Sequence, residues 1–160
     1  MANTQSMCTS FLGELLTATH NFGTAPIRAA GTADTFKAAL YLTTATVNAA
    51  TTAYSATNEV SGTNYNAGGV AVTNATAPNS TNTSSTAGVA YWTPSASLVY
   101  TNVTLSTAFD ALMLYNYTKG TAGDYPAVSI HTFGSQTVTA GTFTLTMPTN
   151  DASNALIRIA

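Results

Sequence analysis

The acidic, histidine and cysteine side chains are the residues of this 160-residue chain whose chemistry could support catalysis. General acid–base catalysis needs two carboxyl groups within several ångströms of one substrate, but the six acidic residues stand singly in the sequence. No Gly-x-Ser-x-Gly turn is present to expose a nucleophilic serine beside a histidine. We therefore predict that the protein is not an enzyme and that it has no catalytic residues.

The two histidines and the cysteine each have a plainer structural interpretation. His20 is expected to cap helix carbonyl groups or to pack beside Phe22. His131 is expected to be an exposed or hydrogen-bonded strand residue, and Cys8 a small buried apolar one. No Cys/His cluster has the spacing of metal ligands, so no metal or cofactor is predicted. An ion at a loop or at an interface between subunits stays open.

Glycine and aromatic residues supply two further expectations. Gly68-Gly69 does not continue into a phosphate-binding loop, so a turn with positive φ is the simpler interpretation. Tyr117 and Tyr125 flank a predicted loop, where aromatic rings could bind sugars or anchor a protein interface. The alternative for the tyrosines is ordinary packing in the core or along strand edges.

Charge is the most unusual feature of the composition. Only 6% of the residues are charged. In an ordinary soluble domain the charged fraction is roughly 25%. The four basic residues are scattered, so no basic stripe exists for nucleic acid. Because net charge keeps molecules apart, a nearly neutral protein tends to associate, and this composition favours one that is packed beside copies of itself.

Targeting signals are not evident in the sequence. The first residues lack the basic region and the long apolar run of a signal peptide. A membrane-spanning helix needs roughly 20 consecutive apolar residues. No apolar run in this chain approaches that length. We therefore expect a protein that is made in the cytoplasm and has no membrane partner.

An N-terminal helix is predicted over residues 7 to 19. Phe11, Leu12, Leu15 and Leu16 fall at helical spacing and form one apolar stripe. The stripe either contacts a neighbouring subunit or packs against the protein's own sheet. The segment is short and needs such packing to persist. We accordingly divide the chain into a helical arm, residues 1–22, and a β domain, residues 23–160.

Short segments rich in β-branched and aromatic residues follow the helix. They predict strands at 35–42, 70–73, 89–92, 98–105, 111–116, 127–133, 136–139, 142–147 and 156–159. Residues 43–69 are interpreted as a long ordered excursion, 74–87 as a loop, and 117–125 as a hairpin loop. This spacing predicts a mainly β fold, an antiparallel β-sandwich or a jelly-roll-like domain.

Several segments resemble a family of small structural proteins of tailed-bacteriophage virions. The matching segments are Ser10-Phe-Leu-Gly-Glu-Leu-Leu16, His20-Asn-Phe22, Asp34-Thr-Phe-Lys-Ala-Ala-Leu-Tyr41, Thr52-Ala-Tyr-Ser-Ala-Thr-Asn-Glu-Val-Ser-Gly62, Asn64-Tyr-Asn-Ala-Gly-Gly-Val70, Gly141-Thr-Phe-Thr-Leu-Thr-Met-Pro148 and Asp151-Ala-Ser-Asn-Ala-Leu-Ile-Arg-Ile-Ala160. The resemblance covers most of the chain, whereas residues 74 to 108 depart from the family pattern.

The resemblance implies a virion protein, and we expect a capsid decoration or cement protein. Its partners would be other copies of itself and the major capsid protein or other virion proteins, and its location the virion. A tail or head-fibre component that binds host-surface glycans is the alternative. A hydrolase acting on the host envelope is the third hypothesis, and it would require a cleft with two close carboxyl groups.

Overall fold

The computed structural model contains strands arranged in two antiparallel sheets. It describes residues 3–9, 11, 15, 19, 20, 22, 33–75, 77–81, 83, 85, 87–119 and 124–160. The strands are β1 (Ser6–Met7), β2 (Phe36–Leu42), β3 (Val70–Ala71), β4 (Asn79–Ser80), β5 (Ala90–Trp92), β6 (Leu98–Asn116), β7 (Ala127–Leu145) and β8 (Ile157–Ile159). The prediction of a mainly β, antiparallel fold is confirmed.

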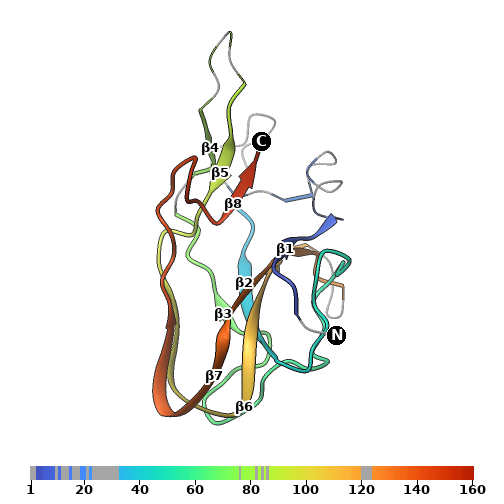
Figure 1. The fold of residues 1–160 in the computed structure, drawn as a ribbon, viewed down its shortest axis with the longest axis vertical. Helices are drawn as coiled ribbons and strands as arrows, with labels where there is room; N and C mark the ends of the chain where they lie inside the picture. The colour runs from blue at the N-terminus through green and yellow to red at the C-terminus, as the bar shows by residue number, and fades with distance from the viewer. Residues whose placement is uncertain are drawn as a thin grey trace.

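The larger sheet is built around one long hairpin. Its strand order is β1-β7-β6-β2-β3, and β6 and β7 are its longest members with 19 residues each. They pair antiparallel from Leu98 opposite Leu145 to Tyr115 opposite Ala127, and the register shifts repeatedly in between. Such irregularities bend a strand and increase its twist, and Figure 1 shows the resulting curved ribbon.

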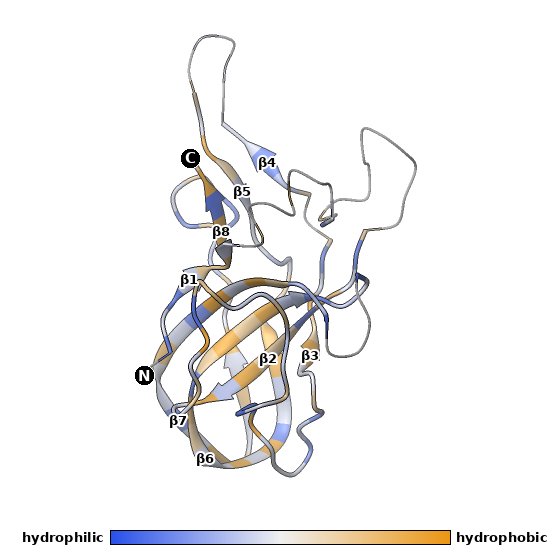
Figure 2. Cartoon of the chain, turned by 90° about the vertical axis from the view of Figure 1, so that its right-hand side faces the viewer, coloured by the Kyte–Doolittle hydropathy of each residue, from blue (hydrophilic) through white to orange (hydrophobic). Residues whose placement is uncertain are grey.

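The hairpin bends so strongly that its two halves face each other. Phe133 and Phe143 are ten residues apart on β7, which would separate them by about 33 Å along a straight strand. Their ring centroids lie 5.5 Å apart, and Phe109 packs 5.0 Å from Phe143. The core lies inside this fold of the ribbon, and Figure 2 shows hydrophobic residues along β2 and hydrophilic ones on β4. The strand order alone does not establish a sandwich or a jelly roll.

The smaller sheet contains three short strands in the order β4-β5-β8. It joins the core through Trp92, which is 2% exposed and lies opposite Ile157 of β8. The Trp92 ring packs 4.7 Å from Phe22, which in turn stacks 4.4 Å from Phe36 at the start of β2. A few aromatic side chains thus connect the C-terminal strand to the main sheet.

The excursion between β2 and β3, residues 43–69, is tied to the sheet along its length. Isolated bridges join Tyr41 to Glu59, Ala53 to Pro126 and Thr63 to Thr104. The segment ends at Gly68 and Gly69, whose φ angles are 88° and 73°. The predicted ordered excursion and its positive-φ turn are therefore both present.

The N-terminal prediction needs correction. Ser6 and Met7 form β1, which pairs with Ile130 and Ser129 of β7, so the segment starts as a strand where a helix was expected. Thr9, Phe11 and Leu15 have helical conformation, but most of the range 7–19 lies outside the described residues, so no helix is delimited there. At Met7 strand pairing replaces the predicted start of the helix, because β7 offers a partner that the local pattern does not reveal. The division into residues 1–22 and 23–160 stays a prediction.

Strand lengths also differ from the expectation. The predicted strands 98–105 and 111–116 are one strand, β6, and the three predicted between 127 and 147 are one strand, β7. Gly134-Ser135, which separates two of the predicted strands, lies within the continuous strand β7, where the pairing with β6 shifts in register. Strand β4 lies within the predicted loop 74–87 and pairs with β5 through Asn79 and Ser80.

Candidate functional site

Tyr117 and Tyr125 flank the connection between β6 and β7, and their rings lie close together. Their ring centroids lie 4.8 Å apart. Tyr117 is 41% exposed, and the Nζ atom of Lys37 on β2 lies 3.9 Å from the centre of its ring. A cation over an aromatic face is an attractive contact, so Lys37 orients the exposed ring.

Two further tyrosines extend this cluster inward. Tyr54 stacks on Tyr115 with centroids 4.6 Å apart, and Tyr115 lies 5.9 Å from Tyr125. The backbone N–H of Tyr54 donates to the carbonyl of Tyr125 at 2.8 Å, which fastens the excursion to the start of β7. We define the tyrosine cluster as Tyr54, Tyr115, Tyr117 and Tyr125. The sequence pattern did not identify Tyr54 and Tyr115 as members because the contact joins distant segments.

A buried carboxylate, Glu59, contacts the cluster through Tyr54. Its oxygens accept hydrogen bonds from the hydroxyl of Tyr54 at 2.6 Å, the hydroxyl of Tyr65 at 2.7 Å and the N–H of Gly68 at 2.7 Å. Burial first, and then the charge of Glu59, raise the pKa of Tyr65 above its ordinary value. The hydroxyl groups stay protonated and donate to the carboxylate, which a buried anion requires. Glu59 is the only charged residue between 43 and 69. Its isolation is the one feature of the sequence that could have identified it as a functional or structural residue.

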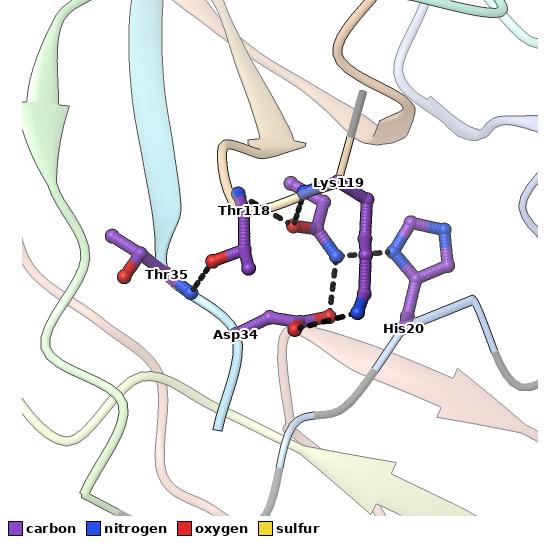
Figure 3. A network of polar contacts seen from close by, with 6 residues as sticks. His20, Asp34, Thr35, Thr118 and Lys119 are labelled. Carbon is purple, nitrogen blue, oxygen red and sulfur yellow. Dashed lines mark hydrogen bonds and ion pairs between the residues drawn. The ribbon is translucent and has the colours of Figure 1, made fainter. Parts of the chain in front are cut away.

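A second buried polar network surrounds Asn116, the last residue of β6 (Figure 3). Its Nδ2 donates to Asp34 Oδ2 at 2.7 Å and contacts His20 Nδ1 at 3.1 Å. Its Oδ1 accepts the N–H groups of Thr118 and Lys119 at 3.0 and 3.1 Å. Because these donors fix the amide orientation, Nδ1 of His20 must be the acceptor in its contact.

The Asn116 network joins three segments that are distant in sequence. Lys119 Nζ lies 3.6 Å from Asp34 Oδ1, and Thr35 N–H donates to Thr118 Oγ1 at 2.6 Å. The His20 ring also packs 4.9 Å from Phe11 and 6.2 Å from Phe22. The packing beside Phe22 agrees with the expectation for His20. These contacts hold the chain together around the end of β6.

His131 lies on the inner side of the folded ribbon beside an apolar cavity of about 210 Å³. The cavity walls include Leu112, Leu114 and Phe133 from one half of the ribbon, and Leu98 and Leu145 from the other. Burial lowers the pKa of His131 to about 4, so its ring is neutral at pH 7. The contact of Ser129 Oγ with His131 Nε2, at 2.8 Å, makes it a hydrogen-bonded strand residue as expected.

The apolar stripe proposed for an interface is only partly visible. Phe11 is 1% exposed and packs against Phe22 with centroids 5.9 Å apart, so it belongs to the protein's own core. Leu15 is partly buried against that core. Leu12 and Leu16 lie outside the described residues. The alternative in which the stripe packs on its own sheet therefore holds for Phe11, because its ring is not available to a neighbour.

Three of the described acidic residues and the cysteine take part in structural contacts or packing. Asp34 and Glu59 are buried with their donors, and Asp151 accepts from Thr149 Oγ1 at 2.6 Å and from the N–H of Ser153 at 2.8 Å. Those hydrogen bonds lower the pKa of Asp151 below its ordinary value. Cys8 is fully buried, as expected for a small apolar residue. Within the described part of the chain, no three His, Cys, Asp or Glu residues gather as metal ligands.

Comparison with known proteins yields no relative: no protein-family model, curated protein or solved structure matches this chain. None of the described residues forms a helix of the length and apolar character needed to cross a membrane. The class that the structure defines is a mainly antiparallel β protein with a long folded hairpin. The assignment to a family of phage structural proteins stays a prediction.

Proposed function

We propose that this protein is a non-enzymatic structural subunit of a tailed-bacteriophage particle, acting as a capsid decoration or cement protein. The observation that supports the proposal most directly is the nearly uncharged exterior. Only ten of 160 residues are acidic or basic, and two of these, Asp34 and Glu59, are buried. A freely diffusing protein relies on surface charge to stay apart from others, whereas a subunit in a lattice does not.

The mechanism follows from mass action. A protein that binds only the assembled shell lowers the free energy of that state and so resists its disruption. Because a shell offers many equivalent sites, contacts between neighbouring subunits add to each contact with the shell. Each single interface can then be small. We also propose that the folded hairpin and the small sheet act together as a sandwich-like body for this purpose.

Purified protein mixed with undecorated shells tests the proposal. We expect saturable binding in a sedimentation assay and a higher temperature of shell disruption, since the bound form stabilises the lattice. Electron cryomicroscopy of mature particles would then place the subunit on the shell. Absence of binding under near-native conditions, together with its absence from mature particles, would contradict the proposal.

The tyrosine cluster favours a second candidate, a tail or head-fibre component that binds host-surface glycans. Exposed aromatic rings stack on the apolar faces of sugars, and Tyr117 presents such a ring, oriented by Lys37. Binding to host cells distinguishes this candidate from the first. Tyr117→Ala should weaken cell binding several-fold, and Tyr91→Ala, on β5 away from the cluster, should not.

A further inference from the structure

One edge of the main sheet is open along the C-terminal half of β7. Strand β7 lies between β6 and β1, but β1 pairs only with Ser129 and Ile130. From 133 to 145, β7 therefore has β6 as its one neighbour among the described strands. In Figure 1 this part of β7 runs along one margin of the molecule. Its outward N–H and C=O groups are available to pair with another strand.

This edge lacks the charged residues and prolines that often prevent strands of different molecules from pairing. Natural edges are protected by charged side chains, proline, bulges or a covering segment. No charged residue occurs from 132 to 150, and the first proline is Pro148. Ala140, with a φ of 45°, marks an irregularity just before the last segment of the strand. The stretch 141–147, whose residues up to Leu145 belong to β7, contains no charged residue and no proline.

The order of side chains in this stretch is almost the same in both directions. Thr142, Thr144 and Thr146 are exposed, and Phe143 and Leu145 are partly buried. If two copies pair antiparallel with Thr144 at the centre, Thr144 faces Thr144. Thr142 then faces Thr146, and Phe143 faces Leu145. Hydroxyl pairs and aromatic–aliphatic pairs across strands are stabilising, and no like charges meet.

We propose that residues 141–147, the end of β7 and the two residues after it, pair antiparallel with the same residues of a second copy of this chain, about a two-fold axis at Thr144. A two-fold contact uses the same patch on both subunits, which the self-complementary order of residues provides. The pair would join two five-stranded sheets into one continuous sheet. The inference deepens the proposed assembly role and rests on it for its biological purpose.

The test measures the mass of the purified full chain by sedimentation velocity over a range of concentrations. The unmodified protein should sediment at twice the 16.4 kDa chain mass. Thr144→Lys places two ammonium groups opposite each other, and Thr144→Glu two carboxylates, so each variant alone should dissociate at least about tenfold more readily. An equimolar mixture of the two variants should recover the dimer, because opposite charges then face each other.

Thr57→Lys is the matched control, since Thr57 is an exposed threonine in a turn of the excursion. It should leave the dimer unchanged. Amide hydrogen exchange of the unmodified protein gives a second measurement that needs no variant: protection of residues 141–147 should increase with concentration. A monomeric unmodified protein, a dimer that both Thr144 variants preserve, or a dimer without such protection would each overturn the proposal.

The outcomes separate this inference from the proposed function. A dimer with the expected charge response that fails to bind shells supports the edge pairing and contradicts the decoration role. A monomer that binds and stabilises shells contradicts the edge pairing and supports the decoration role.

Discussion

Asn116 shows how one side chain can organise the end of a strand. Its amide satisfies two buried acceptors and two backbone donors, from Asp34, His20 and the turn that follows β6. A buried polar group that loses its partner costs free energy of its own. Because Asn116 is fully buried, water cannot replace a partner that its amide loses.

Asn116→Asp should therefore destabilise the protein strongly. The change replaces the Nδ2 donor by an oxygen and places a second carboxylate beside Asp34, so we expect a loss of roughly 3 kcal/mol in the free energy of unfolding. Urea denaturation at pH 7 measures it. The control is Asn66→Asp, at an exposed position of the excursion. This control should change stability by only about 0.5 kcal/mol or less. Equal effects of the two substitutions would contradict the role of the network.

His131 should make stability depend on pH in a defined window. Its pKa is about 4 in the folded protein and 6.5 ordinarily, so the unfolded chain binds the proton more readily. Stability is therefore lost as pH falls from about 6.5 towards 4, and the loss should reach roughly 2 kcal/mol at pH 5. His131→Gln cannot titrate and should lose correspondingly less between pH 7 and pH 5. Superimposable pH profiles of the two proteins in chemical denaturation would contradict the prediction.

At the scale of elements, the turn that leads into β3 depends on a glycine. A Cβ atom on Gly69 would lie 1.7 Å from the carbonyl oxygen of Ala38, and the φ of 73° disfavours any other residue. Gly69 is thus where the excursion returns to the sheet beside β2. The sequence pattern located this turn correctly because paired glycines at the end of a polar stretch are a local signal.

Gly69→Ala should cost about 3 kcal/mol or more, since the clash is with backbone and the φ angle is strained as well. Thermal unfolding followed by circular dichroism measures the loss. Gly134→Ala is the matched control within β7, because its nearest contact would be Gln136 Nε2 at 4.0 Å. We expect that variant to retain the stability of the parent or to gain about 0.5 kcal/mol. A mild effect at Gly69 would show that the excursion can move away from β2.

At the scale of the whole molecule, low charge determines how association should respond to salt. Screening weakens contacts that depend on exposed charges within a Debye length, about 8 Å at physiological ionic strength. This protein has a formal net charge of only −2, and its described buried acids are already paired within the subunit. If the protein associates with copies of itself as proposed, those contacts come mainly from apolar burial and neutral hydrogen bonds.

Shell binding and self-association should accordingly be almost independent of salt. Between 50 mM and 500 mM sodium chloride we expect the dissociation constants to change by less than about twofold. Titrations in the sedimentation assays measure this directly. A steep decrease in affinity with added salt would indicate charged partners that the composition does not predict.

The sequence by itself determined the features that depend on neighbouring residues. Alternation of Phe36, Ala38, Leu40 and Leu42 predicts β2, and the spacing of short segments rich in β-branched and aromatic residues predicts an antiparallel β protein. The sequence also placed Tyr117 and Tyr125 at the two ends of the connection between β6 and β7. Local propensity and period suffice for such features, because the backbone conformation of a few residues decides them.

Only the tertiary structure decided the pairings between distant segments. Met7 is in a strand because β7 lies beside it, and Tyr54 joins the tyrosine cluster because the excursion folds back onto Tyr125. Several predicted strands are parts of two long strands, β6 and β7, and the bend of β7 brings Phe133 close to Phe143. These contacts are stabilising because side chains far apart in sequence meet and exclude water. A local pattern of residues does not indicate which distant partners will meet.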